Sequence, residues 1–180
     1  LASASLESTF VLTQRSAAVR RIATSTNAVA RDALLPRLCA GELFATVGIS
    51  HLTTSGQHLA KPLVQVRPTD EGFELDGLVP WSTGATQADV LVTGGTLSDG
   101  RQILAAIPTD RLGLDVQPPM QLMAMNASQT GAVRLKAVRV YGDELLHGPI
   151  EGVMRQGTGG GAGSLGTSAL AIGAAAGTIR

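Results

Sequence analysis

The sequence has few aromatic residues, 3% of its 180 residues, and its charges cancel, with 14 lysines and arginines against 14 aspartates and glutamates. The hydrophobic residues, 44% of the chain, must therefore build a core mainly from aliphatic side chains. A zero net charge gives no electrostatic footprint for nucleic acid or for an anionic membrane surface. Length and composition predict one domain, or one domain with flanking pieces.

Cysteine and long apolar runs are also scarce. The single cysteine, Cys39, excludes an internal disulfide and is typical of a reducing compartment, so we expect a cytoplasmic location. No apolar run reaches the about 20 residues that a membrane span needs; the segment 164–179 comes nearest and is rich in glycine and alanine. The sequence starts without a signal-peptide pattern or an initiator methionine, and both ends fall inside apparent helices. We therefore expect the chain to be a piece of a longer protein.

The first forty residues have the apolar spacing of helices. Thr26 and Asn27 offer a cap for a second helix within this zone. Pro36 is expected to kink that helix or end it early, and Gly41 follows as a stop signal.

Residues 42–140 are typical of strands, because short apolar and β-branched runs are separated by turn signals at 70–72 and 98–100. Such strands predict an antiparallel barrel or sandwich. A glycine run at 157–163 then precedes a helix of small residues at 165–176. The order of helices, strands and helix predicts an α+β fold.

Several common motifs are absent or weak. The GxGxxG string at 161–166 lacks a preceding strand and a later acidic residue, which favours a flexible linker over a dinucleotide fingerprint. No lysine follows it, which excludes a phosphate-binding P-loop, and Ala162 breaks the GxSxG hydrolase pattern. His51, His58 and His147 are too scattered to predict a metal site, and we interpret them as solvated loop histidines.

Two predicted strand ends carry hydroxyl groups. Trp81 follows an apolar strand and precedes Ser82 and Thr83, so a broad ring lies beside hydroxyl donors that suit a planar ligand. Spacing alone favours a plain core tryptophan with a capping hydroxyl. The segment 48–51 ends an earlier strand and offers the Ser50 hydroxyl, although a strand end satisfied by its own turn is commoner. The two ends make a small-molecule cleft plausible without identifying the ligand.

Ordered motifs along nearly the whole chain resemble those of the acyl-CoA dehydrogenase family. They are LLPRLCAGE at 34–42, a strand at 43–50 that ends in serine, GLVPWSTGATQAD at 77–89, MAMNASQT at 123–130 and LLHG at 145–148. The resemblance implies the middle β-domain of a three-domain fold with helical pieces attached. Its implied domains are the end of an N-terminal helical domain at 1–41, a β-barrel at 42–148, and a linker with the first helix of a C-terminal helical domain at 149–180.

The resemblance also implies FAD as cofactor and dehydrogenation of an acyl-CoA or related acyl thioester at its α,β bond, as in fatty acid metabolism. A carboxylate base removes a proton in that reaction, and hydride passes to flavin N5. An electron-transfer acceptor and a homo-oligomer of the full-length protein are implied as partners. Backbone and hydroxyl donors would hold the ring and Trp81 would shield one side of it; the implied contacts are Ile49, Ser50, Trp81, Ser82 and Thr83.

The chain departs from the family pattern in the loop that, in the family, helps to hold the cofactor and the acyl thioester. The family's EPxxGSD is replaced by HLTTSGQ at 51–57, which leaves the binding of a CoA thioester open, and Asn126 replaces an arginine. The family's base lies in the C-terminal bundle, after Arg180, so no catalytic residue is assigned and we expect the isolated piece to be inactive. The altered loop keeps a flavin monooxygenase of the same fold as an alternative. A third possibility is a non-catalytic binding or scaffold barrel.

Overall fold

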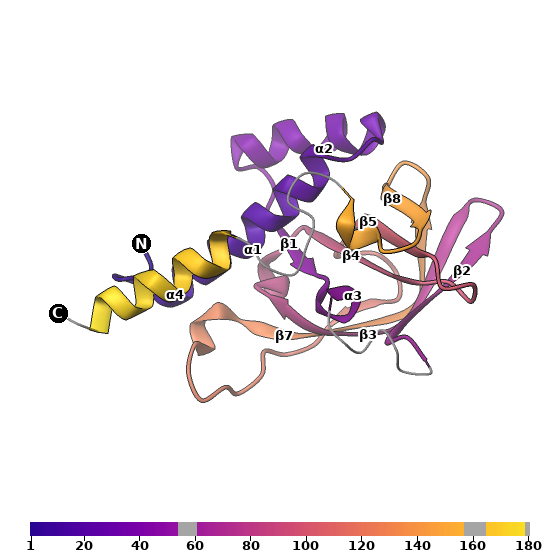
Figure 1. The fold of residues 1–180 in the computed structure, drawn as a ribbon. Coiled ribbons are helices and arrows are strands. Elements are labelled where there is room, and N and C mark those ends of the chain that lie inside the picture. Colours follow the sequence, from indigo (N-terminus) through magenta and orange to yellow (C-terminus); the bar gives the residue numbers. More distant parts are fainter. Residues whose placement is uncertain (54–60, 157–164, 179–180) are drawn as a thin grey trace.

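The computed structural model describes residues 1–53, 61–156 and 165–178 (Figure 1). It has the expected α+β class, a curved sheet with helices packed against it. The loop positions 54–57 and the glycine-rich segment 157–163, for which sequence expectations were given, lie outside the described residues. The helices are α1 (Leu6–Ala23), α2 (Ala28–Ala40), α3 (Ser50–Thr53) and α4 (Leu165–Thr178), with 3-10 turns η2 (Ala85–Gln87), η3 (Asn126–Ser128) and η4 (Val153–Arg155).

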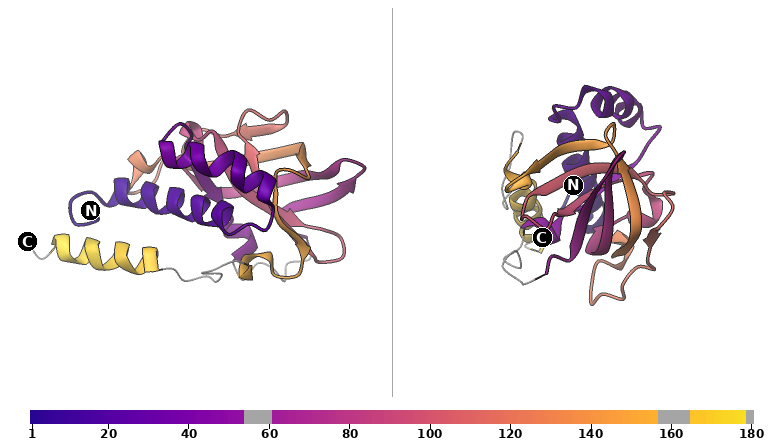
Figure 2. Two further views of the ribbon diagram at one scale, coloured as in Figure 1. Left: turned by 90° about the horizontal axis from the view of Figure 1, so that it is seen from above. Right: turned by 90° about the vertical axis from the view of Figure 1, so that its right-hand side faces the viewer.

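The sheet has eight strands in the order β6-β7-β3-β2-β4-β5-β8, and β1 pairs with β4 off this path. Most neighbours are antiparallel, as predicted, but β1 and β2 both pair with β4 in parallel. The strands curve around an apolar interior (Figure 2). Their bounds are β1 (Ala45–Gly48), β2 (Val64–Thr69), β3 (Gly72–Thr83), β4 (Val90–Thr96), β5 (Gln102–Pro108), β6 (Leu114–Val116), β7 (Thr130–Tyr141) and β8 (Leu145–Ile150).

Two apolar clusters use opposite faces of the sheet. The first joins Ile22 of α1 and Leu38 of α2 to Leu104 of β5, and the second fills the curved interior with residues such as Leu75. Ile103 belongs to the second cluster although it adjoins Leu104, because successive side chains of a strand point to opposite faces. The clusters therefore share the strands that lie between them.

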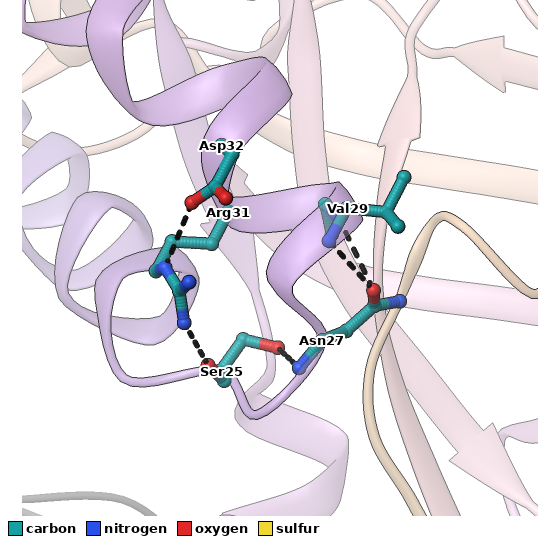
Figure 3. Close-up of polar contacts among 6 residues, drawn as sticks. Ser25, Asn27, Val29, Arg31 and Asp32 are labelled. Atoms are coloured by element: carbon teal, nitrogen blue, oxygen red, sulfur yellow. Dashed lines mark hydrogen bonds and ion pairs between the residues drawn. The ribbon is translucent and has the colours of Figure 1, made fainter.

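The turn between α1 and α2 is fixed by its own side chains (Figure 3). The Asn27 Oδ1 accepts the Val29 N–H at 3.1 Å, which confirms the predicted cap, and the Ser25 Oγ accepts the Asn27 N–H at 3.1 Å. Ser25 Oγ also donates to the Leu146 carbonyl at 2.7 Å. This buried hydrogen bond attaches the helical pair to β8.

Pro36 was expected to kink α2 or to end it early, and the early end is wrong. The helix continues through Pro36 to Ala40 and ends at Gly41, whose φ of 76° is left-handed as the stop signal predicted. Proline removes one hydrogen bond of the helix, but contacts with other parts of the chain hold the turn that follows it. Leu38 is fully buried, and its carbonyl accepts a hydrogen bond from Arg15 Nη2 at 2.5 Å.

Candidate functional site

The ends of β1 and β3 lie against each other. Thr46 Oγ1 donates to the Thr83 carbonyl at 2.7 Å, and Ser82 Oγ donates to the Val47 carbonyl at 3.4 Å. These buried hydrogen bonds reach across the two strands near their ends. They bring the two predicted strand ends together, as the sequence interpretation requires.

Gly48, the last residue of β1, allows this close approach. A Cβ at position 48 would lie 2.6 Å from Val79 Cγ1 of β3, closer than side chains tolerate. On the other side, Thr93 Oγ1 of β4 donates to the Gly48 carbonyl at 2.6 Å. The backbone that leads into residues 49–50 is therefore fixed from both neighbouring strands.

Trp81 lies at an irregularity of β3. The pairing with β7 shifts register between Val79 and Ser82, which is the signature of a β-bulge. The Trp81 side chain is 50% exposed, whereas Ser82 and Thr83 are buried. The indole is therefore not a plain core residue.

Ile49 and Ser50 differ in what they can offer. The Ile49 side chain packs against the helix-side cluster, and its carbonyl accepts the Leu52 N–H at 3.0 Å. Ser50 begins α3, which lies beside β3 (Figure 1). Its Oγ is buried and has no hydrogen-bond partner among the described residues. A buried hydroxyl without a partner is unusual in a folded protein.

Sequence reasoning missed a chain of three hydroxyls that ends at Thr83. Thr130 Oγ1 lies 2.9 Å from Thr83 Oγ1 and 2.8 Å from Ser128 Oγ, and all three residues are buried. The Gly84 N–H donates to the Ser128 carbonyl at 3.1 Å, which fixes the end of β3 against η3. The signal in the sequence that could have found this chain of hydroxyls is the motif at 123–130, which places Ser128 and Thr130 two positions apart.

The interpretation of His51 and His147 as solvated loop residues is wrong, because both rings are partly buried in ordered structure. His51 Nε2 bonds the Gly94 carbonyl at 2.9 Å, while its Nδ1 is buried without a partner among the described residues. Burial lowers the pKa of His51, and the hydrogen bond to Gly94 opposes this. Burial, followed by the charge of Arg21, lowers the pKa of His147. His58 lies outside the described residues.

Asn126, which departs from the family pattern, has a structural role in its loop. Its Oδ1 accepts the Leu122 N–H at 2.8 Å and its Nδ2 donates to the Leu122 carbonyl at 2.9 Å. The neighbouring Ala127 N–H donates to Glu7 Oε1 of α1 at 3.1 Å. The loop before the hydroxyl chain is thus held by its own amide and by the first helix.

Neither a metal centre nor a membrane-spanning helix is found in the described part of the chain. Within residues 1–53, 61–156 and 165–178, no three histidine, cysteine, aspartate or glutamate side chains gather as metal ligands would. No helix in these ranges has both the length and the apolar character that a membrane crossing needs.

Comparison with solved structures shows that the curved sheet and the helices on it form the acyl-CoA dehydrogenase fold. Glutaryl-coenzyme A dehydrogenase in its glutaryl-CoA complex superposes with a TM-score of 0.73 at 21% identity, over 84% of this chain and 40% of that one. FMN-bound TdsC from Paenibacillus sp. A11-2 superposes with a TM-score of 0.67 at 23% identity, over 82% and 38%. No family model matches the sequence.

Two curated relatives share part of the sequence. Dibenzothiophene monooxygenase of Rhodococcus erythropolis is 30% identical over 101 residues, which are 53% of this chain and 24% of that protein. The probable acyl-CoA dehydrogenase YngJ of Bacillus subtilis strain 168 is 28% identical over 123 residues, 66% of this chain and 32% of that protein. The aligned parts therefore span a third or less of the length of either relative.

Proposed function

We propose that the chain is the flavin-binding part of a flavin-dependent oxidoreductase with the acyl-CoA dehydrogenase fold, and that FAD is its cofactor. The reaction is the α,β-dehydrogenation of an acyl thioester such as an acyl-CoA. The observation that carries the proposal is the meeting of the ends of β1 and β3 beside a half-exposed indole. The named functions of the relatives and of the superposed structures support it.

The residues at this place fit a flavin ring. Trp81, which is half-exposed, can cover a planar ring, and a shift of Ser50 would bring its buried, unpartnered hydroxyl to a ring carbonyl. Thr83 ends β3 with a hydroxyl that could bond the ring in addition to Thr130. The Ser82 hydroxyl is bonded to the Val47 carbonyl, so its contribution to the cofactor is limited to backbone groups. Ile49 likewise contributes backbone groups.

When bound, the flavin supplies the hydride acceptor. The chain's own residues would bind and orient the ring: Trp81 would cover one face of it, and Ser50 and Thr83 would offer hydroxyls to its polar edge. Preorganised donors of this kind would stabilise negative charge on a bound ring. The carboxylate base is assigned to no residue of this chain.

Titration with flavin tests the proposal, because Trp81 is the only tryptophan. We expect FAD to quench its fluorescence to saturation. Ser50→Ala and Thr83→Val each remove one hydrogen bond and should weaken binding roughly threefold to tenfold. Ser98→Ala, an exposed hydroxyl in the turn after β4, is the matched control and should bind as the parent does. Unsaturable quenching, or equal affinity of all four proteins, would contradict the proposed site.

A flavin monooxygenase is the second candidate, favoured by the 30% identity to dibenzothiophene monooxygenase and by His51 at the position of the family's glutamate. In the full-length protein, an acyl-CoA should bleach the bound flavin without oxygen if the enzyme is a dehydrogenase. Oxygen consumption with reduced flavin and an aromatic substrate, without bleaching by acyl-CoA, would favour the monooxygenase. A protein that takes up no flavin would favour a binding or scaffold barrel.

The remaining assignments belong to the same proposal. We infer an electron-transfer acceptor and a homo-oligomer for the full-length protein, a role in fatty acid metabolism, a cytoplasmic location and little or no turnover by the isolated piece. The proposed domain boundaries follow residues 41 and 148, although β8 extends to Ile150. Robust dehydrogenation by these 180 residues alone would contradict the proposed inactivity.

A further inference from the structure

The outer face of β3 and β7, on the side of the sheet away from α2, carries a cation without a partner (Figure 1). Leu78 of β3 pairs in register with Arg134 of β7. Their neighbours Val79 and Val133 belong to the interior cluster, so the first pair points to the outside. Arg134 is exposed, and no hydrogen bond or ion pair joins its guanidinium to another described residue. The guanidinium is therefore free to bind an anion.

Trp81 lies one step farther along the same two strands. At the bulge of β3, Pro80 and Trp81 oppose Ala132 alone. Ala132 and Arg134 are two positions apart in β7, so they share a face and their Cα atoms lie about 7 Å apart. The indole is 50% exposed, and Leu78 on the same face is 38% exposed. One ligand can therefore contact both the indole and the guanidinium.

The carboxylate that faces Arg134 in the register does not pair with it. Asp115 of β6 lies opposite Arg134, but its Oδ2 accepts a hydrogen bond from Gln117 Nε2 at 2.6 Å. Lys136, two positions farther along β7, is exposed on the same face and also has no ion pair with a described residue. This face therefore presents two cations that no described carboxylate contacts, and it favours an anionic ligand.

We propose that Arg134 binds the phosphate on the ribityl chain of the flavin cofactor while Trp81 covers the ring. The inference rests on the proposed function. FMN and FAD share this phosphate, and riboflavin lacks it. A guanidinium suits a phosphate because its N–H groups can form two parallel hydrogen bonds to phosphate oxygens. The ribityl chain separates the phosphate from the ring, and Arg134 lies at a comparable separation from Trp81 along the sheet.

The experiment titrates the full chain with riboflavin, FMN and FAD and measures quenching of Trp81. In Arg134→Gln we expect the affinities for FMN and FAD to fall about tenfold, because charge-assisted hydrogen bonds are lost, and the affinity for riboflavin to stay within about twofold. Arg134→Lys keeps the charge without the planar fork and should recover part of the loss. Arg20→Gln removes an exposed cation from α1 and is the matched control, which should bind all three flavins as the parent does.

A second variant tests the same charge in the opposite direction. Asp115→Asn removes the negative charge opposite Arg134 and should strengthen binding of FMN about twofold without changing binding of riboflavin. Damage to the fold would weaken binding of all three flavins, so it cannot produce this gain. Asp115→Asn therefore carries the test if Arg134→Gln fails to fold.

The outcomes distinguish the phosphate site from the proposed function. If the parent binds riboflavin as tightly as FMN, or if Arg134→Gln weakens all three flavins equally, the phosphate site is overturned while the flavin site stands. The same holds if neither Arg134→Gln nor Asp115→Asn changes the affinity for FMN. If the parent binds none of the three flavins, both proposals are overturned.

Discussion

Burial of two imidazoles gives the fold a pH dependence that originates at single residues. His51 and His147 have pKa values lowered below the ordinary 6.5 in the folded state, so the unfolded chain binds more protons as the pH falls through that value. The free energy of unfolding should therefore be nearly constant above about pH 7 and should decrease as the pH falls below about 6.5.

Urea denaturation at several pH values between about 7.5 and 5 measures this decrease. His51→Gln keeps a donor for the Gly94 carbonyl but cannot gain a proton, so its stability should change less with pH, and the remaining change should come from His147. An unchanged pH dependence in His51→Gln would show that folding does not lower the pKa of this ring.

Single residues also show where sequence reasoning about the site stopped. The sequence placed hydroxyl residues and an indole at two strand ends, and the hydrogen bonds of Thr46 and Ser82 show that those ends meet. It could not show that the Ser50 hydroxyl lacks a partner, or that Thr130 approaches Thr83, because these depend on distances between segments far apart in the chain. The roles of the individual residues toward a cofactor remain predictions.

At the scale of elements, the pairing of β4 with β5 depends on a glycine. A Cβ at Gly94 would lie 1.8 Å from the Ile103 carbonyl oxygen, which belongs to the backbone of β5 and cannot rotate away. Gly94→Ala should therefore push the strands apart and cost several kcal/mol, about 3 or more, like other severe core substitutions. It should also disturb the carbonyl that His51 contacts.

Gly142→Ala is the matched control, since nothing lies within 4 Å of a Cβ at that position and its φ is not left-handed. Thermal denaturation of the two variants should give a large decrease in Tm for Gly94→Ala and almost none for Gly142→Ala. Equal midpoints would mean that β4 and β5 can separate there without loss of stability.

Elements with local signals could be predicted from the sequence, and elements defined by distant partners could not. The Asp70-Glu71-Gly72 turn and the Asn27 cap act within a few residues, and both are present. The short strand β6 exists through its pairing with β7, and β8 through its pairing with β5. The parallel pairings of β4 also bring together segments that no local pattern connects.

At the scale of the whole molecule, the site depends on both apolar clusters. Ala45 and Val47 of β1 belong to the helix-side cluster, whereas Val79 and Ala85, which flank the end of β3, belong to the interior cluster. The two strand ends that meet at the site are therefore supported from opposite faces of the sheet. Loss of either cluster should misplace one half of the site.

Neighbouring residues of β5 allow a test of whether the two clusters unfold together. Ile103 and Leu104 are both fully buried but belong to different clusters. Replacement of either by alanine should lower the free energy of unfolding by about 2–5 kcal/mol, from lost burial and the cavity left behind. Leu112→Ala is the control, because that side chain is 91% exposed and its truncation should cost little.

Urea titrations followed by two probes decide the question, with Trp81 fluorescence reporting on the sheet and far-ultraviolet circular dichroism reporting mainly on the helices. Because β4 and β5 contribute side chains to both clusters, we expect coincident transitions in the parent and in each variant, with both probes shifted together. A Leu104→Ala protein whose circular dichroism transition moves to lower urea while its Trp81 transition stays in place would show that the helices separate from an intact sheet. It would also show that the proposed flavin site can lose its helical support without unfolding.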